Sequence, residues 1–249
     1  MAFKFVIADT KRFSSVIDVV ELLVDEVLLC VSSEGVVFTA LDKPHTSFVN
    51  VELGVDYFVD YTVGDPNGCE VLVDTLQLKQ VLHRGGSDEL TVEYDQDNEK
   101  LNLVFTGVAT KKFSINLISD DYEPPSMPDI PYSVCYEVSW KALKDSLGDA
   151  GLYEDKVKLS NREGLGVESH GDFGDYTTVI QSIDQDQDND GSTTALYSLE
   201  KIKDTFKLNL SDYVTVEYGQ DMPVLLTWKS DDETAKVEYL LAPRIEEDV

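Results

Sequence analysis

Three patterns in this sequence resemble sites of chemistry, and each lacks a part that the chemistry requires. Residues 186–191 read Asp-Gln-Asp-Asn-Asp-Gly, like the start of a calcium loop, but the twelfth position is Tyr197 where calcium needs a bidentate Glu. Asp172-Phe173-Gly174 copies the magnesium motif of protein kinases without their Gly-rich or catalytic loops. No pair of histidines has metal-ligand spacing among His45, His83 and His170. We therefore predict no metal, no cofactor and no catalytic activity.

The placement of the basic residues indicates a different chemistry, which is contact with phosphate. Apolar residues recur at helical spacing in four segments, 9–22, 74–84, 139–147 and 198–207. These segments hold nine Lys and Arg against seven Asp and Glu, whereas the rest of the chain holds the other eleven of 20 basic and 41 of 48 acidic residues. The nine basic residues are Lys11, Arg12, Lys79, Arg84, Lys141, Lys144, Lys201, Lys203 and Lys207.

Two interpretations of these lysines are open. Lys is a good helix former on any solvated face, so its presence on helices can be ordinary. If the four helices share one surface, that surface would instead touch phosphate by charge and without reading bases. The net charge of −28 gives the average surface no attraction for nucleic acid, so an acidic DNA-mimicking inhibitor is an alternative function.

The chain is organised around an internal duplication. Residues 87–97 read SDELTVEYDQD and residues 211–221 read SDYVTVEYGQD, identical at eight of eleven positions and separated by 124 residues in a chain of 249. A second repeat relates residues 31–36 to residues 160–165, and each of these segments is a strand followed by a Glu-Gly turn. This period is too long for a solenoid repeat and fits one small domain used twice.

Between the two copies lies a linker that cannot form a regular element, because residues 119–131 contain four prolines. We expect an N-terminal domain at 1–118, this connecting loop at 119–131, and a C-terminal domain at 132–249. Short strands with two helices in each half predict an α+β fold. No apolar run approaches the roughly 18 residues of a membrane span, and Met1-Ala2-Phe3-Lys4 does not lead into the apolar core of a signal peptide, so we expect an intracellular protein. Three cysteines without CxxC spacing fit buried thiols in a reducing cytosol.

The ending Leu240-Leu241-Ala242-Pro243-Arg244-Ile245-Glu246-Glu247, with Ala40-Leu41-Asp42 and His45 upstream, resembles the archaeal and eukaryotic DNA sliding clamps, the family of proliferating cell nuclear antigen. The resemblance spans the whole chain. It implies a head-to-tail ring of three subunits with two similar domains each, helices lining the hole and sheets outside. The four helices would then share the inner wall, and their nine basic residues would face duplex DNA.

The resemblance also implies a pocket for the short PIP-box of polymerases, clamp loader, ligases and flap nucleases. Its matching positions are Leu41, His45, Phe48, Met127, Pro223, Leu240, Ala242, Pro243 and Ile245, although aliphatic residues such as these are ordinarily core. Two strand edges, 110–117 and 176–182, would join across subunits. The interface residues would be Arg84, Lys111, Asp145, Asp149, Val179 and Ile180.

We therefore interpret the sequence as a non-enzymatic processivity factor that encircles DNA. The alternatives are one subunit of a heterotrimeric or checkpoint-type ring, and the DNA mimic described above. The expected location is the cytoplasm and nucleoid for an archaeal protein, or the nucleus for a eukaryotic one.

Overall fold

The duplicated segment forms two equivalent strands in the computed structural model, which describes residues 2–65, 67–96, 98–183 and 192–245. One copy forms β7 (Glu89–Asp95) and the other forms β15 (Tyr213–Tyr218). The neighbours of each follow the same order, β1-β7-β8-β9 and β10-β15-β16-β17. These six neighbours are β1 (Phe3–Ile7), β8 (Lys100–Thr106), β9 (Thr110–Asn116), β10 (Val134–Ser139), β16 (Val224–Lys229) and β17 (Ala235–Leu241).

A second group of strands is repeated in the same way, in the orders β6-β2-β3-β4 and β14-β11-β12-β13. The first four are β2 (Glu26–Ser32), β3 (Gly35–Leu41), β4 (Ser47–Gly54) and β6 (Cys69–Asp74). Their counterparts are β11 (Lys156–Arg162), β12 (Gly164–Gly171), β13 (Gly174–Ile180) and β14 (Thr194–Ser198). The expected α+β fold of two similar, β-rich halves is therefore confirmed.

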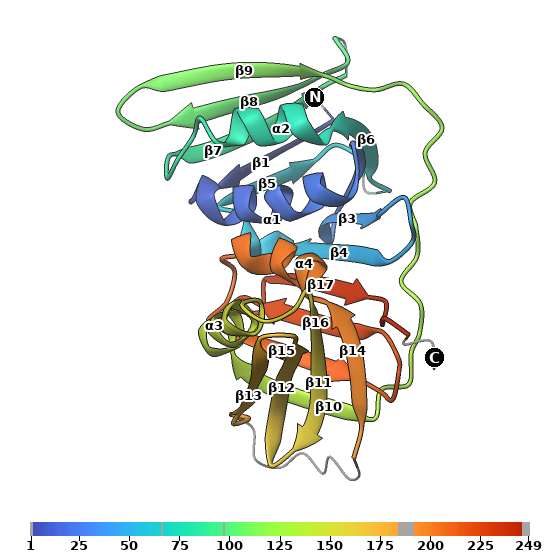
Figure 1. The fold of residues 1–249 in the computed structure, drawn as a ribbon. Helices are drawn as coiled ribbons and strands as arrows, with labels where there is room; N and C mark the ends of the chain where they lie inside the picture. The colour runs from blue at the N-terminus through green and yellow to red at the C-terminus, as the bar shows by residue number, and fades with distance from the viewer. Residues whose placement is uncertain (1, 66, 97, 184–191, 246–249) are drawn as a thin grey trace.

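The two halves join through one pair of strands (Figure 1). β17 pairs antiparallel with β4, with Leu240 opposite Phe48, and this pairing makes a single sheet of eight strands, β10-β15-β16-β17-β4-β3-β2-β6. By contrast, β9 ends the five-stranded sheet β5-β1-β7-β8-β9, and β13 ends the four-stranded sheet β13-β12-β11-β14. The strands that correspond to the paired β17 and β4 are therefore sheet edges.

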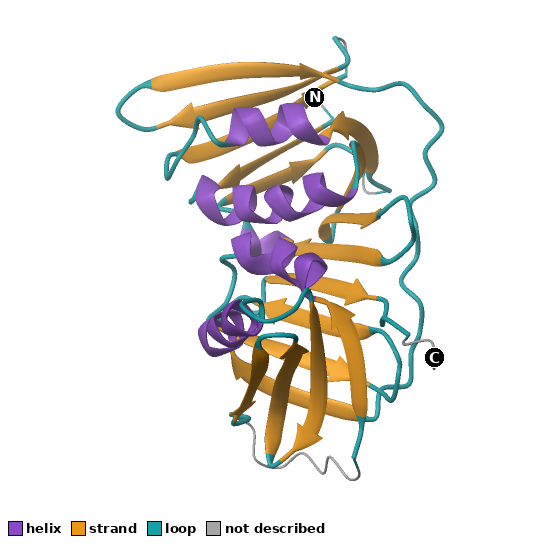
Figure 2. Cartoon of the chain, viewed as in Figure 1, coloured by secondary structure: helices purple, strands orange, loops and turns teal. Residues whose placement is uncertain are grey.

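All four α-helices lie on one side of the sheets (Figure 2). They are α1 (Thr10–Leu23), α2 (Thr75–Leu82), α3 (Trp140–Ala150) and α4 (Leu199–Lys203), with short 3₁₀ turns η1 (Val55–Tyr57) and η2 (Asp204–Lys207). Three begin at a side-chain cap: Asp9 accepts a hydrogen bond from Lys11 N, Asp74 from Gln77 N, and Ser139 from Ala142 N. The apolar stripe of α1 packs onto the sheets, with Phe13, Val16, Ile17 and Val20 all buried.

The structure departs from the sequence-based expectation at several helix ends and at two strands. α3 continues to Ala150 beyond the expected residue 147, and the segment expected as one helix at 198–207 consists of α4 and the 3₁₀ turn η2. α2 ends at Leu82 rather than at residue 84, and Gly85 follows closely, where a Cβ would lie only 2.3 Å from the ring of Phe105. Two strands were not expected. β5 (Asp60–Val63) has only four residues and forms by pairing with β1, while β14 has five residues and forms by pairing with β11. Such short strands depend on tertiary pairing.

The expected linker runs along one side of the molecule, from β9 to β10 (Figure 1). Apart from a single bridge between Ile118 and Leu72, residues 117–133 form no helix or strand. The hydroxyl of Thr39 on β3 donates a hydrogen bond to the carbonyl of Pro125 (3.0 Å), which holds the linker against the sheet. Within the described residues, no helix is long and apolar enough to cross a bilayer.

Candidate functional surfaces

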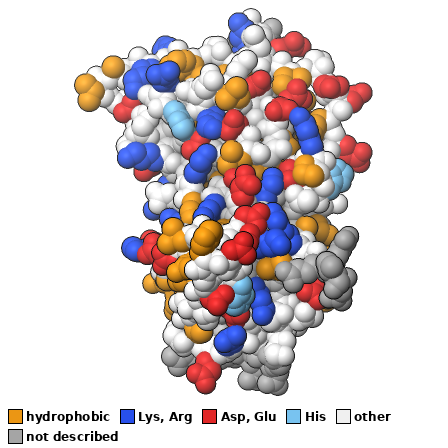
Figure 3. Space-filling model, in the orientation of Figure 1, with side chains coloured by type: hydrophobic (Ala, Val, Ile, Leu, Met, Phe, Trp, Pro, Cys, Tyr) orange, Lys and Arg blue, Asp and Glu red, His pale blue; other side chains and the backbone are white. Residues whose placement is uncertain are grey.

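The helices form a continuous row, which we call the helix face. α2 packs beside α1, η2 beside α1, and α3 beside α4, so elements from both halves meet in one layer. Figure 3 shows Lys and Arg side chains spread over this face, mixed with Asp and Glu. All nine expected basic residues lie on the row or, in the case of Arg84, two residues beyond the end of α2.

The nine basic residues fall into two groups according to their partners. Lys79 pairs with Glu21 (2.5 Å), Lys141 with Asp145 (2.5 Å) and Lys201 with Asp42 (3.3 Å). Lys144 lies over the ring of Trp140, 5.1 Å from its centroid. Within the described part of the chain, no carboxylate comes within 4.0 Å of the remaining five, which are Lys11, Arg12, Arg84, Lys203 and Lys207. The charge offered to a ligand is therefore concentrated on this second group.

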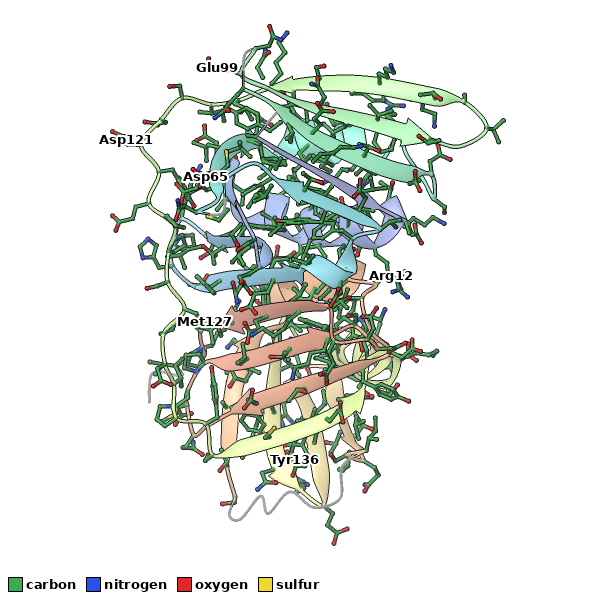
Figure 4. The ribbon with its side chains drawn as sticks, turned by 180° about the vertical axis from the view of Figure 1, so that it is seen from behind. Arg12, Asp65, Glu99, Asp121, Met127 and Tyr136 are labelled. Carbon is green, nitrogen blue, oxygen red and sulfur yellow. The ribbon has the colours of Figure 1, made fainter. Side chains whose placement is uncertain are left out.

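A small apolar cluster, separate from the main core, lies on the sheet face away from the helices. It consists of the buried Phe48, Leu225 and Leu240, with Leu41, Met127, Ile130 and Tyr132 packed against it. We call these seven residues the outer cluster. Val49 and Val51 alternate with Phe48 along β4 and point into the main core instead. Figure 4 places Met127 of the linker and Arg12 of the helix face on opposite sides of the molecule.

The outer cluster joins four of the expected partner-binding residues, Leu41, Phe48, Met127 and Leu240. Sequence reasoning missed Leu225, Ile130 and Tyr132. The first of these carried a signal, because Leu225 belongs to the apolar run at 224–226 next to the expected Pro223. Tyr132 is half-buried, and this burial raises its pKa to about 12, so the phenol stays neutral in the cluster.

The loop between β3 and β4 fixes one rim of the outer cluster. Asp42 is buried and its Oδ1 accepts hydrogen bonds from the backbone amides of Thr46 (2.7 Å) and Ser47 (2.9 Å). Burial raises the pKa of Asp42, but the bonds from Ser47, Thr46 and Lys201 outweigh it and hold the pKa below its usual value. His45, at the tip of the loop, is exposed and has a left-handed backbone with φ 59°.

The C-terminal segment lies against the same loop. Ala242 N donates to Thr46 O (2.8 Å), and Arg244 N donates to Leu196 O (2.7 Å), so the segment bridges the loop and β14. The Arg244 guanidinium adds contacts to Asp155 (3.3 Å) and Ser198 (3.4 Å). Of the other expected positions, Pro223 precedes β16 and Pro243 lies between the two anchored residues. Ile245 is 82% exposed and lines a neighbouring cavity.

The two free sheet edges carry charges of opposite sign. Beside β9 lie Lys111, Lys112 and Arg84, and Lys111 donates to the carbonyl of Arg84 (2.7 Å) while pairing with Asp88 (3.2 Å). β13 contains Asp175, and α3, which packs against β13, carries Asp145 and Asp149. On β13 itself, Val179 is 39% exposed and Ile180 is buried.

The calcium-like, kinase-like and histidine patterns of the sequence lie in different parts of the chain. The calcium-like residues 186–191 lie outside the part of the chain that the structure describes. Asp172 and Phe173 form the turn between β12 and β13, with Phe173 exposed, and Gly174 is the first residue of β13. His83 lies 2.8 Å from Asp18 and His170 lies 2.8 Å from Asp175. Within the described ranges, no group of three or more His, Cys, Asp and Glu could hold a metal ion.

Comparison with known proteins adds three kinds of similarity. Residues 4–123 match the family model described as proliferating cell nuclear antigen, N-terminal domain. The chain is 34% identical over 247 residues to the DNA polymerase sliding clamp of Methanothermobacter thermautotrophicus, covering 98% of each protein. It has the fold of PCNA from Thermococcus kodakaraensis, with a TM-score of 0.88 and 23% identity over 97% of this chain and 100% of that one. The A. fulgidus PCNA solved with the C-terminal region of FEN-1 gives the same TM-score at 21% identity, over 99% and 100%.

Proposed function

The chain belongs to the family of DNA polymerase sliding clamps, and we propose that three copies close head to tail into a ring around duplex DNA. In this proposal the protein tethers other enzymes and catalyses no reaction itself. A closed ring need not bind DNA tightly, because its topology prevents dissociation. We place it on the DNA of the cell, in the cytoplasm if the protein is archaeal like the relative from Methanothermobacter.

The observation that best supports the proposed ring is the pair of free sheet edges, β9 and β13. We take the two domains as 1–118 and 132–249, joined by 119–131. In this repeat, β9 corresponds to β17 and β13 corresponds to β4, and β17 already pairs with β4 inside the chain. The β9 edge of one subunit can therefore pair with the β13 edge of the next by the same geometry. A head-to-tail contact that repeats in this way generates a closed ring if its rotation closes.

The internal pairing also supplies a register for the proposed contact. The two repeated segments align the equivalent strands of the two halves. When the strand pairing is followed outward from these segments, Phe113 on β9 is equivalent to Tyr239 on β17, and Tyr176 on β13 is equivalent to Val49 on β4. Tyr239 and Val49 are opposite each other in the chain. We therefore propose that Phe113 stands opposite Tyr176 of the next subunit. Lys111 and Arg84 would approach the side that carries Asp145 and Asp149, with Val179 and Ile180 in the pairing strand.

The helix face is the surface that would line the hole. It gathers eight of the nine expected cations in one layer, with Arg84 just beyond the end of α2, although the chain as a whole carries a net charge of −28. A weak lining of this kind contacts phosphate without base readout and is screened by salt, which suits sliding. The same gathering of lysines argues against the DNA-mimic alternative, which would need carboxylates there.

The outer cluster is the proposed binding site for PIP-box proteins, which include polymerase, clamp loader, ligase and flap nuclease. It is apolar, lies away from the helix face, and is bordered by the β3–β4 loop and the C-terminal segment, which are hydrogen-bonded to each other. Anchoring side chains of a peptide would replace the contacts that Met127, Ile130 and Tyr132 now make. A mixed ring is the second assembly to consider, but this chain carries both edges and needs no other kind of subunit to close.

The test compares basic residues that have no carboxylate partner among the described residues with basic residues that have one. Replacing Lys11, Arg12 and Lys207 together by Ala should lower polymerase stimulation on primed circular DNA and reduce the salt dependence of DNA binding. The slope of log affinity against log salt should fall by about 0.9 for each phosphate that the variant no longer neutralises. Lys79→Ala with Lys141→Ala is the matched control and should have a smaller effect, since Glu21 and Asp145 already neutralise these residues. Unchanged stimulation by the triple variant at moderate salt would refute a DNA-facing helix face.

A further inference from the structure

One basic residue of the helix face, Lys201, forms an ion pair with a loop of the first half. Lys201, on α4, extends its ammonium to Oδ2 of Asp42 at 3.3 Å, so a residue of the second half meets a loop of the first half. The side chain of Asp42 is only 4% exposed, whereas that of Lys201 is 35% exposed. Tyr239 on β17 fixes the helix beneath it by donating its hydroxyl to the carbonyl of Lys201 (2.9 Å).

The Asp42 carboxylate organises the whole loop between β3 and β4. In addition to the two amide bonds at Oδ1, its Oδ2 accepts from the hydroxyl of Thr46 (2.8 Å). The backbone closes the same turn, because Asp42 N donates to Ser47 O (3.0 Å) and His45 N donates to Asp42 O (2.9 Å). Lys201 is the one cation within 4.0 Å of this carboxylate among the described residues. A buried carboxylate needs such a partner, since burial without one is costly.

The loop in turn sets both the walls and the rim of the outer cluster. Leu41 and Phe48 stand immediately before and after the residues that Asp42 ties together, and both are cluster members. Thr46 holds the C-terminal segment through its carbonyl, which accepts from Ala242 N (2.8 Å). A change in the Asp42 turn would therefore move two walls of the cluster and one rim together.

We propose that Lys201 is a positioning residue of the outer cluster and not a DNA contact: by neutralising Asp42 it holds the loop that places Leu41 and Phe48 for an apolar peptide anchor. This inference rests on the proposed peptide-binding function. It also distinguishes Lys201 from Lys207, which belongs to the same α4–η2 segment, is exposed, and has no carboxylate within ion-pair distance among the described residues.

The first measurement is the affinity of the intact protein for a fluorescent PIP-box peptide, by polarisation. Lys201→Met, which keeps much of the side-chain length and removes the charge, should weaken binding about tenfold. Lys201→Arg retains a donor and a charge and should stay within about threefold of wild type. In an Asp42→Asn background, where no charge needs neutralising, Lys201→Met should have little further effect.

The reciprocal variant is Lys207→Met, which removes the same charge from the same segment. We expect its peptide affinity to match wild type and the salt slope of its DNA binding to fall by about 0.9 for each copy of Lys207 that contacts a phosphate, which is up to about 2.7 for a ring of three. Lys201→Met should show the opposite result, weaker peptide binding with the wild-type salt slope. A lowered slope with unchanged peptide affinity in Lys201→Met would overturn the proposal and return this residue to the DNA-facing set.

Hydrogen exchange of the Thr46 and Ser47 amides provides a readout that does not depend on any peptide. Lys201→Met should accelerate exchange at these two amides, and Lys201→Arg should not, with thermal melting confirming that both variants fold. If the wild-type protein binds no PIP-box peptide, the proposed function fails while this arm still decides whether Lys201 holds the loop. Equal exchange in Lys201→Met and wild type would overturn the positioning role directly.

Discussion

The junction inside the chain and the two free edges are built on equivalent strands, yet they carry different side chains. At the junction, the outer face of the sheet presents Leu41, Phe48, Leu240 and Leu225, which pack together in the outer cluster. Counting through the same paired strands, the equivalent residues at the free edges are His170, Asp175, Ser114 and Asn102. These are polar, and they bond within their own sheets: His170 to Asp175 (2.8 Å) and Ser114 to Asn102 (2.6 Å).

This difference shows how one repeated domain acquires two kinds of junction. The repeated backbone preserves the strand edges, so β9 and β13 retain the geometry that β17 and β4 use. The apolar quartet Leu41, Phe48, Leu225 and Leu240 forms an outer cluster at the junction alone among the described residues. In the proposed ring of six domains, partner sites would then occur at the three junctions within subunits and not at the three between them.

The largest expected effect comes from removing the pairing capacity of one free edge. Successive amides of a strand alternate in direction, so one of Val179 and Ile180 directs its N–H away from β12. Proline at that position removes a donor that only the next subunit would use. We expect Val179→Pro or Ile180→Pro to convert trimers to monomers by native mass spectrometry, with Val179→Ala remaining trimeric. Trimers in both proline variants would show that β13 is not the subunit contact.

The next effect tests whether the apolar quartet accounts for partner binding. Leu240→Ala should cost about 2 kcal/mol of peptide affinity, roughly a 30-fold rise in Kd, because a wall of the cluster is removed. The trimer should persist in native mass spectra, since Leu240 lies at the junction within the chain. Leu241 makes a poor second target because it is 1% exposed in the main core and its truncation would destabilise the fold. Wild-type affinity in Leu240→Ala would separate the outer cluster from peptide binding.

Much of the architecture was accessible from the sequence because duplication and apolar periodicity are local signals. The repeated SDELTVEYDQD segment located equivalent strands, and the stripe from Phe13 to Val20 located α1. The resemblance located Leu41, Phe48 and Leu240. What could not be predicted depends on contacts between distant residues. β5 exists only because it pairs with β1, and Tyr132 enters the cluster only because the linker folds back over the sheet.

The same limit applies to charge. Sequence position placed Lys79, Lys141 and Lys201 with the other cations, but their roles differ because each has a carboxylate nearby. For Lys141 that partner is four residues away, at helical spacing, and could have been anticipated. For Lys201 the partner is Asp42, 159 residues away in sequence, and only the packing of α4 against the first half brings the two together.

The smallest expected effect concerns salt, which acts on the junction between subunits and spares the one within the chain. Two opposing forces operate there. Each subunit carries a net charge of −28, so whole subunits repel one another over long distances. Across the proposed contact, Lys112 and Arg84 on one side attract Asp149 and Asp175 on the other at short range.

Screening decides between these forces, because the Debye length falls from about 10 Å at 0.1 M salt to about 3 Å at 1 M. Repulsion between charges spread over whole subunits is screened first, whereas ion pairs that touch across the junction are screened less. We therefore expect the trimer to strengthen modestly as salt rises from low to about 0.5 M, measured by sedimentation at a fixed subunit concentration. Lys112→Glu should assemble less well than wild type at every salt concentration, because it removes an attraction and adds to the repulsion. A trimer that weakens steadily with added salt would show that these ion pairs, and not the net charge, dominate assembly.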